Sequence, residues 1–366
     1  MAAALPVAEP APGAPVAPAD GFRADLLRAA FGPEVPGETV HRTIAAFAGA
    51  ASPNTLRALR SDLKHIDAFQ QRRGRPALPL APGDCFILVD ERARAGSAKA
   101  SIDRLVASAV RLHQLAGLPS PVDDTVRWKL KEIRKADTRP VRQALGLRIK
   151  GEVGDVHTDA PHPISLLALL ESIPANPAGL RDRALLSCAY DAGLRRSEVV
   201  RARVEHFEPL PSGEAALFLP RSKTDQEGEG ARVWMSARTM HHVAVWQEAA
   251  ELTAGYVFQS LSYRISPRGH LHESAVAKIL KQRLAAHLAP MVERGELSQA
   301  EADKIVEEMS AHSLRVGCDQ DLFAAGVDIG AIMQGLRWTS PRQPLAYARH
   351  LAPASSKLAA VMRNVR

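Results

Sequence analysis

The sequence predicts a mainly α-helical protein of two domains: a small helical bundle, followed by an α+β domain with one small β-hairpin. Three observations support this prediction. The 366 residues are enough for two ordinary domains, and 46% of them are hydrophobic, so each domain can bury a core. Apolar residues recur at helical spacing over most of the chain. Two short apolar runs, bounded by turn residues, lie between positions 215 and 235.

The segment 22–138 is expected to contain helices only. One helix begins at Ser52-Pro53, and two more are predicted near residues 102–112, with Gly117 as the C-terminal cap, and 126–133. Amphipathic helices joined by Pro/Gly turns are typical of a helical bundle. The preceding segment 1–21 is rich in Ala and Pro, and we expect a disordered tail. The first helix shows the apolar spacing of 3, 4, 3 and 3 in Leu56, Leu59, Leu63, Ile66 and Phe69.

Positive charge is concentrated at the end of this helical segment. Residues 127–150 hold nine Lys or Arg and only two acids, a local excess of +7 that equals the net charge of the whole chain. Such a run is usually a solvated surface, but this concentration favours contact with a phosphate backbone. A basic linker is expected at 139–160. The candidate DNA-binding residues are Lys129, Lys131, Arg134, Lys135, Arg139 and Arg142.

The second domain is expected at 161–366. Helical patterns cover 164–173 and 180–202, and helices are predicted again from about residue 273 to the end. The apolar runs 215–219 and 232–235 flank a polar segment that contains Lys223, which predicts a β-hairpin with a long turn.

Several classes of protein are disfavoured. Cys85, Cys188 and Cys318 are far apart, which argues against a disulfide framework or a zinc site and is typical of a reduced cytosol. The histidine-containing segments 241–242 and 269–272 lack further ligands at suitable spacing, so no metal site is predicted. The sequence contains no P-loop and no apolar run near the roughly 20 residues of a membrane span, and the segment 1–20 is not expected to be a signal peptide. We therefore expect a protein of the cytoplasm, bacterial or phage-encoded, that does not contact membranes.

Four segments stand out in the second domain. They are Ala192–Glu198, Arg221–Thr224, Ala311–Gly317, and the pair of Trp338 and Tyr347, which lie nine residues apart. Each segment alone has an ordinary explanation as surface charge or packing. Their combination and order are far more specific.

In this order they resemble the tyrosine recombinase (phage integrase) family, and most closely its Cre-like branch. That family has an Arg in a G-L-R-x-S-E-like motif, a Lys in a β-hairpin, an H-x-x-R motif, a His or Trp, and a C-terminal Tyr. The 35 residues from His312 to Tyr347 also fit the branch. The resemblance is strong over 180–366 and weaker but continuous over 50–150. The sequence departs from the pattern at Gly335-Leu336-Arg337, where a Gly pair often precedes the Trp, and at 291–309.

The resemblance implies an N-terminal helical core-binding (SAM-like) domain and a C-terminal catalytic domain that breaks and rejoins DNA. It implies site-specific recombination through a 3′-phosphotyrosyl intermediate, with no metal, no ATP and no other cofactor. Tyr347 would be the nucleophile, and Arg195 and Arg315 would hold the phosphate. His312 would accept the proton of the phenol, and Lys223 would protonate the leaving 5′ oxygen.

The resemblance also assigns two supporting residues. Trp338 would donate its indole N–H to a phosphate oxygen, and Glu198 would hold catalytic groups in place. A phosphate contact by Lys223 and simple packing by Trp338 are the alternatives.

The implied partner is double-stranded DNA with inverted-repeat target sites. The resemblance implies a homotetramer on two such sites, formed from protomers that are monomeric when free. An apolar stripe at the C-terminus predicts a short helix that either packs on its own domain or docks into a neighbour. Rival functions are a type IB topoisomerase and a DNA-binding protein with an inactive site. The members of the stripe are Leu358, Val361, Met362 and Val365.

Overall fold

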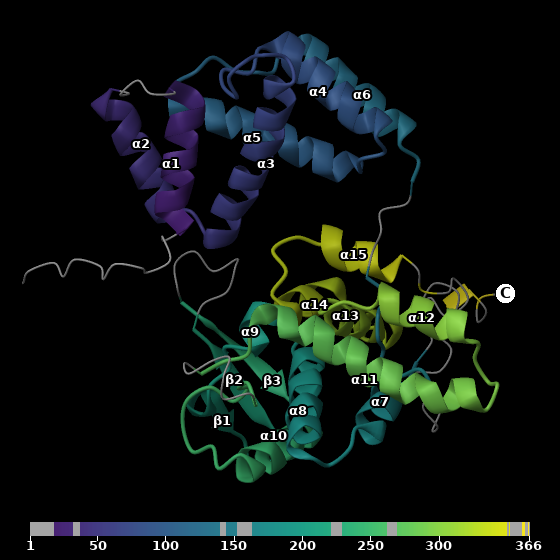
Figure 1. The fold of residues 1–366 in the computed structure, drawn as a ribbon. Helices are drawn as coiled ribbons and strands as arrows, with labels where there is room; N and C mark the ends of the chain where they lie inside the picture. The colour runs from purple at the N-terminus through teal and green to yellow at the C-terminus, as the bar shows by residue number, and fades with distance from the viewer. Residues whose placement is uncertain are drawn as a thin grey trace, which may run out of the picture. The chain divides into compact units, whose positions relative to one another are not determined.

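The computed structural model describes residues 18–31, 37–139, 144–151, 163–220, 229–261 and 269–349, together with Leu351, Val361, Met362 and Val365. The chain divides into two compact units, Met1–Val141 and Arg142–Arg366 (Figure 1). The first unit is helical and the second combines helices with one small antiparallel sheet, so the predicted fold class is confirmed. No helix in the described ranges is both long enough and apolar enough to cross a membrane.

Six helices build the described part of the first unit. The helix expected from Ser52-Pro53 is α3, and the Ser52 Oγ accepts a hydrogen bond from the Thr55 N–H at 3.1 Å, as an N-cap does. Gly117 adopts the left-handed conformation that ends α5. The first helix begins at Pro18, inside the segment expected to be a tail. The bounds are α1 Pro18–Phe31, α2 Glu38–Ala50, α3 Pro53–Gln71, α4 Pro82–Arg94, α5 Lys99–Ala116 and α6 Asp124–Ala136.

The second unit contains a three-stranded antiparallel sheet in the order β1-β2-β3. The two predicted strands pair with each other, and Leu217 lies opposite Val233. The third strand, β1, was not predicted and pairs with the other side of β2. The strand bounds are Phe207–Pro209 for β1, Ala215–Leu219 for β2 and Ala231–Met235 for β3, and a 3₁₀ turn at Val204–His206 precedes β1.

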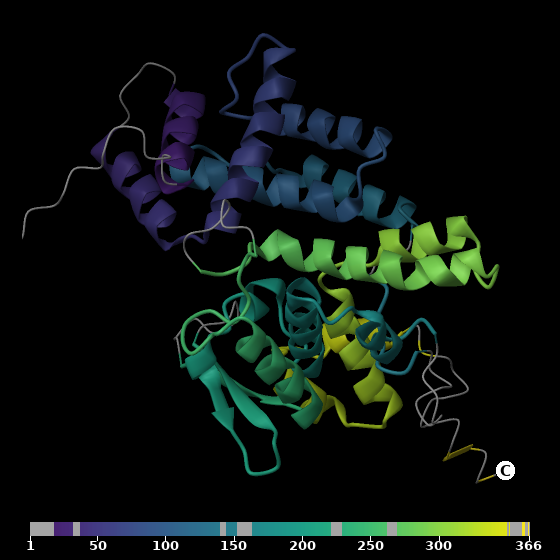
Figure 2. The ribbon, with the colours of Figure 1, turned by 60° about the horizontal axis from the view of Figure 1, so that its bottom comes forward.

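Nine α-helices complete the described part of this unit. Helices α11 and α12 lie side by side as an antiparallel pair (Figure 2). The end of α11 and the whole of α12 lie in the segment 291–309, where the sequence departs from the family pattern, and Ser298 and Glu301 form a capping box that starts α12. The bounds are α7 Leu166–Ser172, α8 Pro177–Asp191, α9 Arg196–Val199, α10 Ala237–Ala249, α11 Glu273–Glu293, α12 Gln299–Glu308, α13 Ser313–Ala324, α14 Ile329–Leu336 and α15 Arg342–Ala348.

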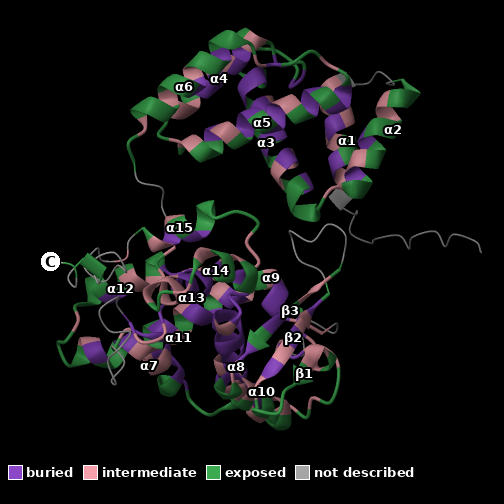
Figure 3. Ribbon diagram, turned by 180° about the vertical axis from the view of Figure 1, so that it is seen from behind, coloured by how far each residue is buried: buried purple, intermediate pink, exposed green. Residues whose placement is uncertain are grey.

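Helix α8 is the centre of the second core. Every residue from Ala184 to Tyr190 is buried, so the helix has no solvent-facing stripe there (Figure 3). It packs against α7, α9, α10, α13 and β3. A helix that is apolar on all sides must be covered on all sides, and α8 thereby places the segment after Asp191 in the interior.

The chain enters the second unit along α13. The Leu147 N–H donates to the Ser313 carbonyl at 3.0 Å, and the Arg148 Nε donates to the Asp321 carboxylate at 2.6 Å. Gly317 lies at the crossing, where an added Cβ would be 2.0 Å from the Leu147 carbonyl oxygen. Part of the segment expected to be a basic linker is therefore packed on α13, and Arg148 from the basic run is buried in an ion pair.

Replacing Gly317 with alanine should destabilise the second unit. The added methyl group overlaps backbone atoms, which cannot move aside as a flexible side chain can, so α13 and residues 144–149 must separate. We expect a loss of about 1–3 kcal/mol in the free energy of unfolding, measured by urea denaturation. Gly335→Ala is the matched control, because its added Cβ meets nothing within 4 Å. Equal stability of the two variants would contradict this account of the crossing.

Candidate active site

The guanidinium of Arg315 is at the centre of the predicted site. Arg315 lies in the first turn of α13 and is 0% exposed. Its two terminal nitrogens donate to the carbonyl oxygens of Gly193 and Leu336. Burial lowers the pKa of Arg315 to about 10, and the nearby Arg195 contributes to the shift, yet the group stays charged at neutral pH. A fixed, buried positive charge is therefore built into this position.

A tight turn after α8 brings Gly193 next to Arg315. Gly193 has φ +50°, and an added Cβ there would be 2.7 Å from the Leu336 side chain and 3.3 Å from the Arg315 side chain. Both the left-handed backbone and the close approach require glycine. The Gly-Leu-Arg motif thus has a structural basis: glycine makes the turn, Leu194 is buried, and Arg195 follows at the start of α9.

Glu198 connects two arginines. Its carboxylate accepts from the Arg195 backbone N–H at 2.9 Å, from the Arg195 side chain at 2.7 Å and from the Arg337 side chain at 2.9 Å. Burial by itself would raise the pKa of Glu198, but Arg337 and Arg195 outweigh burial and the pKa is lowered. Glu198 is therefore an ionised anchor for both guanidiniums.

Arg337 is a site residue that the sequence analysis did not assign. It has φ +55° and ends α14 in the left-handed conformation, which costs a non-glycine residue about 1 kcal/mol. Its side chain is 9% exposed and bonds Glu198 and, at 3.3 Å, the Ala192 carbonyl. At the position where the sequence departs from the family's Gly pair, Arg337 therefore makes an ion pair inside the site. The signal for this role in the sequence was a basic residue at a position that departs from the family pattern.

His312 and Tyr347 meet although they are 35 residues apart. The His312 Nε2 and the Tyr347 hydroxyl are 2.7 Å apart. Burial lowers the pKa of His312 to about 4, with Arg315 and Arg195 contributing, so the imidazole is neutral at physiological pH. Burial also raises the pKa of Tyr347, which is 9% exposed. A neutral imidazole nitrogen beside a protonated phenol is the arrangement that proton transfer requires.

Trp338 lies between the arginine and the tyrosine. The Arg315 guanidinium carbon is 4.1 Å from the Trp338 ring centroid, a cation–π distance, and the Trp338 and Tyr347 rings are 5.8 Å apart. The indole Nε1 is buried and has no hydrogen-bond partner within the described part of the chain. Packing is thus one function of Trp338, and its N–H remains an available donor.

The structure brings together five of the six predicted catalytic residues and Glu198. Lys223 lies outside the described residues, in the segment 221–228 between β2 and β3. In the described ranges, no cluster of three or more His, Cys, Asp and Glu side chains could hold a metal ion. Cys85, Cys188 and Cys318 are all buried and free.

Only some of the candidate DNA-binding residues on α6 are free of ion pairs with described residues. Lys129 pairs with Asp90 at 2.9 Å, and Arg134 pairs with Asp103 at 2.8 Å. Lys131 and Lys135 are exposed, with no ion pair to any described residue. Arg142 lies outside the described residues. The positive charge that faces solvent on α6 is thus smaller than the sequence count indicates.

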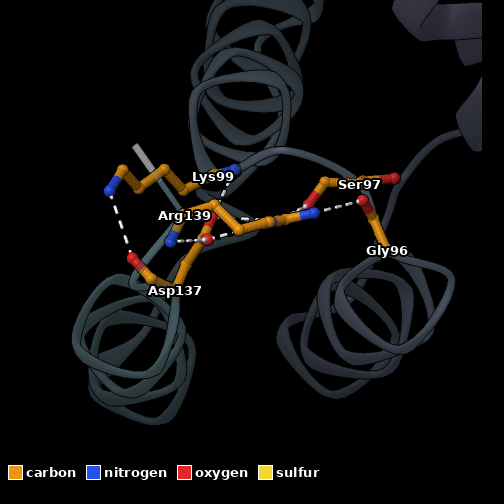
Figure 4. A network of polar contacts seen from close by, with 5 residues as sticks. All are labelled: Gly96, Ser97, Lys99, Asp137 and Arg139. Atoms are coloured by element: carbon orange, nitrogen blue, oxygen red, sulfur yellow. Dashed lines mark hydrogen bonds and ion pairs between the residues drawn. The ribbon is translucent and has the colours of Figure 1, made fainter. Parts of the chain in front are cut away.

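Arg139 joins two loops of the first unit (Figure 4). Its guanidinium pairs with Asp137 at 2.7 Å and donates to the carbonyl oxygens of Gly96 and Ser97 at 2.9 and 3.1 Å. Lys99 also donates to the Asp137 carbonyl at 3.3 Å. Arg139 therefore has a structural function: its contacts attach the segment after α6 to the loop between α4 and α5.

Comparison with known proteins identifies the family. The phage integrase family matches residues 164–353, which is more than half of the chain, and the N-terminal SAM-like domain of phage integrases matches residues 46–117. The chain therefore belongs to the phage integrase family and is a tyrosine site-specific recombinase, a DNA-binding enzyme of DNA recombination and integration.

Individual relatives agree with this assignment. The chain is 25% identical over 306 residues to the recombinase Cre of Escherichia phage P1, covering 82% of this chain and 85% of Cre. It is 24% identical over 303 residues to an integrase/recombinase XerD homolog of Selenomonas ruminantium, covering 80% and 81% of the two chains.

Two solved structures share the fold. XerH recombinase bound to palindromic difH substrate matches with a TM-score of 0.56 and 12% identity, covering 95% of this chain and 94% of XerH. A chain comprising residues 82–397 of the Tn1549 transposon integrase, in complex with a circular intermediate DNA, matches with a TM-score of 0.55 and 14% identity, covering 94% of this chain and 99% of that chain.

Removing the charge of Glu198 should destabilise the second unit strongly. In Glu198→Gln the paired Arg337 stays buried without a counter-charge, and Arg195 loses its anchor. Breaking a buried pair from one side costs about 3–5 kcal/mol, to be measured as the free energy of unfolding in urea. The exposed Glu248→Gln on α10 is the control and should change stability by less than about 0.5 kcal/mol. If the two substitutions cost the same, Glu198 is not a structural anchor.

Proposed function

We propose that this protein recombines DNA at specific sites by cutting and rejoining strands through a covalent bond from Tyr347 to a 3′ phosphate. The observation that carries the proposal is the hydrogen-bond distance of 2.7 Å between Tyr347 and His312, next to the buried charge of Arg315. The reaction draws on side chains of the chain itself and needs neither a metal nor ATP.

In the cleavage step, the Tyr347 oxygen attacks the phosphorus and the bond from phosphorus to the 5′ oxygen breaks. The phenol proton passes to the His312 Nε2, which is free to accept because its pKa is about 4. The leaving 5′ oxygen takes a proton, for which Lys223 is the proposed donor. The new phosphotyrosyl ester replaces one phosphate ester by another, so rejoining by the reverse route needs no added energy.

Arg195 and Arg315 would stabilise the negative charge that develops on the phosphate. Each terminal guanidinium nitrogen carries two hydrogens, so Arg315 can keep its carbonyl contacts and still donate to a phosphate oxygen. The Trp338 Nε1 would supply a further donor, since no described residue accepts from it. These donors are held in place before the substrate arrives, and the charge they offer does not require reorganisation during the reaction.

The proposed partner is double-stranded DNA with inverted-repeat sites, bound by a homotetramer on two sites that assembles from monomers. Support comes from relatives: XerH was solved on a palindromic substrate, and the Tn1549 integrase on a circular intermediate. The C-terminal stripe would dock into a neighbouring protomer. Leu358 lies outside the described residues, while Val361, Met362 and Val365 are 52%, 40% and 72% exposed, which favours docking over packing on the same unit.

Tyr347→Phe should bind DNA and form no covalent adduct, because it lacks only the attacking oxygen. The measurement is trapping on nicked suicide duplexes from a genomic or phage library, with gel detection of the adduct and sequencing of the attached DNA. The wild type should form the adduct at Tyr347 in the presence of EDTA, and Tyr256→Phe, a tyrosine outside the motif, should form it too. An adduct mapped to another residue, or a strict need for a metal, would refute the mechanism. Relaxation of supercoils without joining of two sites would favour a topoisomerase.

Lys131 and Lys135 should account for the phosphate binding of α6. In the double variant Lys131→Ala/Lys135→Ala, binding should weaken and the slope of log K against log salt should flatten by roughly 0.9 for each phosphate that is no longer neutralised. The control Lys278→Ala/Lys304→Ala removes the same charge from exposed positions on α11 and α12 and should keep the slope. An unchanged slope in the α6 variant would show that these lysines are only solvated.

A further inference from the structure

Asp319 on α13 is a buried carboxylate without a hydrogen bond. It is 0% exposed, and neither of its oxygens has a partner within the described part of the chain. Burying an ionisable group without hydrogen bonds is costly, so such a group calls for an explanation. The other buried carboxylates in the described ranges each have an arginine partner, and they are Asp62, Asp84, Asp182 and Glu198.

Asp319 lies one helical turn after Arg315, so the two side chains are neighbours on one face of α13. The charge of Arg315 acts on Asp319 and lowers its pKa, and the charge of Asp319 raises the pKa of Tyr347 and, on α13 itself, of Cys318. Helix α13 packs against α8, α14 and α15. Ionisable groups lie at or near the ends of these helices and in the first turns of α13 and α9. They are Tyr190 and Asp191 on α8, Arg337 after α14, Tyr347 on α15, His312 before α13, and Arg195 and Glu198 at α9.

Of the three arginines in the site, only Arg315 has no hydrogen bond to the carboxylate of a described residue. Glu198 accepts hydrogen bonds from Arg195 and Arg337, whereas Arg315 donates only to carbonyl oxygens. Glu198 also acts on the charge of Arg315, but its hydrogen bonds go to the other two arginines. A second acid, Asp319, lies one helical turn from Arg315. Three guanidiniums thus share one hydrogen-bonded carboxylate, and when no DNA phosphate is present Asp319 can offset part of the buried charge of Arg315.

We propose that Asp319 is an exchangeable counter-charge for Arg315, ionised in the DNA-free site and protonated from solvent when the scissile phosphate binds. The inference rests on the proposed function, since it assumes that Arg315 contacts that phosphate. Asp319 touches neither the substrate nor the reacting atoms and acts through Arg315 and Tyr347, so it is a positioning residue.

The sign of the pH effect follows from the two charge states. Burial raises the pKa of Asp319 to about 7, with Arg315 opposing the rise. Above this pH the ionised carboxylate weakens the attraction of Arg315 for phosphate and disfavours the Tyr347 phenolate. Below it the neutral acid does neither. The bound phosphate is a second negative charge and raises the pKa of Asp319 further in the DNA complex. Ionisation of Asp319 therefore slows cleavage as pH rises above 7, a range in which His312 is already neutral and does not titrate.

The first test compares pH profiles of single-turnover cleavage on the duplex recovered by covalent trapping. The rate of Asp319→Asn divided by the wild-type rate should rise on the order of tenfold between pH 6 and pH 8.5, one pKa unit of interaction. The control Glu248→Gln should keep a constant ratio. A ratio for Asp319→Asn that does not change with pH would overturn the proposal and leave Asp319 with a purely structural role.

The second test needs no change at Asp319 and so holds even if Asp319→Asn fails to fold. Tyr347→Phe protein, which cannot cleave, is titrated calorimetrically at pH 7.5 in two buffers of different ionisation enthalpy, which yields the protons taken up. The normal duplex should take up more protons than a duplex with an uncharged methylphosphonate at the scissile position. Equal uptake would overturn the proposal. Failure of the recombinase mechanism itself would appear separately, as absence of the Tyr347 adduct in the wild type.

Discussion

The buried guanidinium of Arg315 is the interaction on which the rest of the site depends. A charge with no access to water is tolerated only where hydrogen bonds and aromatic contact replace hydration. Here the carbonyl oxygens of Gly193 and Leu336 and the ring of Trp338 supply those contacts. These groups come from the turn after α8 and from the end of α14 with the two residues that follow it. Folding the second unit therefore brings three distant segments together around one positive charge, and the donors that we propose for a phosphate are in place before DNA binds.

The same burial sets the protonation states. A low-dielectric surrounding disfavours charge on His312 and on Tyr347, so both are neutral in the DNA-free site. In the proposed mechanism Tyr347 is thus inactive at rest and loses its proton only when His312 and the nearby arginines act together. Glu198 limits the repulsion among these arginines by pairing with Arg195 and Arg337, while Asp319 lies one helical turn from Arg315 and has no hydrogen bond to a described residue. The site therefore combines the ion pairs of Glu198 with Arg195 and Arg337 and a carboxyl group, that of Asp319, whose charge can change with pH.

The first unit shows how tertiary partners change the meaning of a charge run. Nine basic residues within 127–150 indicate a phosphate-binding surface when they are counted along the sequence. In the structure Lys129, Arg134, Arg139 and Arg148 each face a carboxylate, and three of these carboxylates, Asp90, Asp103 and Asp321, lie more than 30 residues away in sequence. Pairing of this kind depends on which helices become neighbours, and local composition does not contain that information.

Hydrophobic periodicity and motif order were enough to determine the fold class, the helices of the first unit around residues 56, 105 and 130, the β2–β3 pairing, and a set of residues of which Arg195, His312, Arg315, Trp338 and Tyr347 converge. These features follow from local backbone preference and from residue types whose chemistry is recognisable in order. Only the tertiary structure decided the part played by Arg337, the isolation of Asp319 and the division of the basic run. Each of these depends on the distance between side chains from separate segments, and electrostatic energy in a buried site is governed by those distances and by exclusion of water.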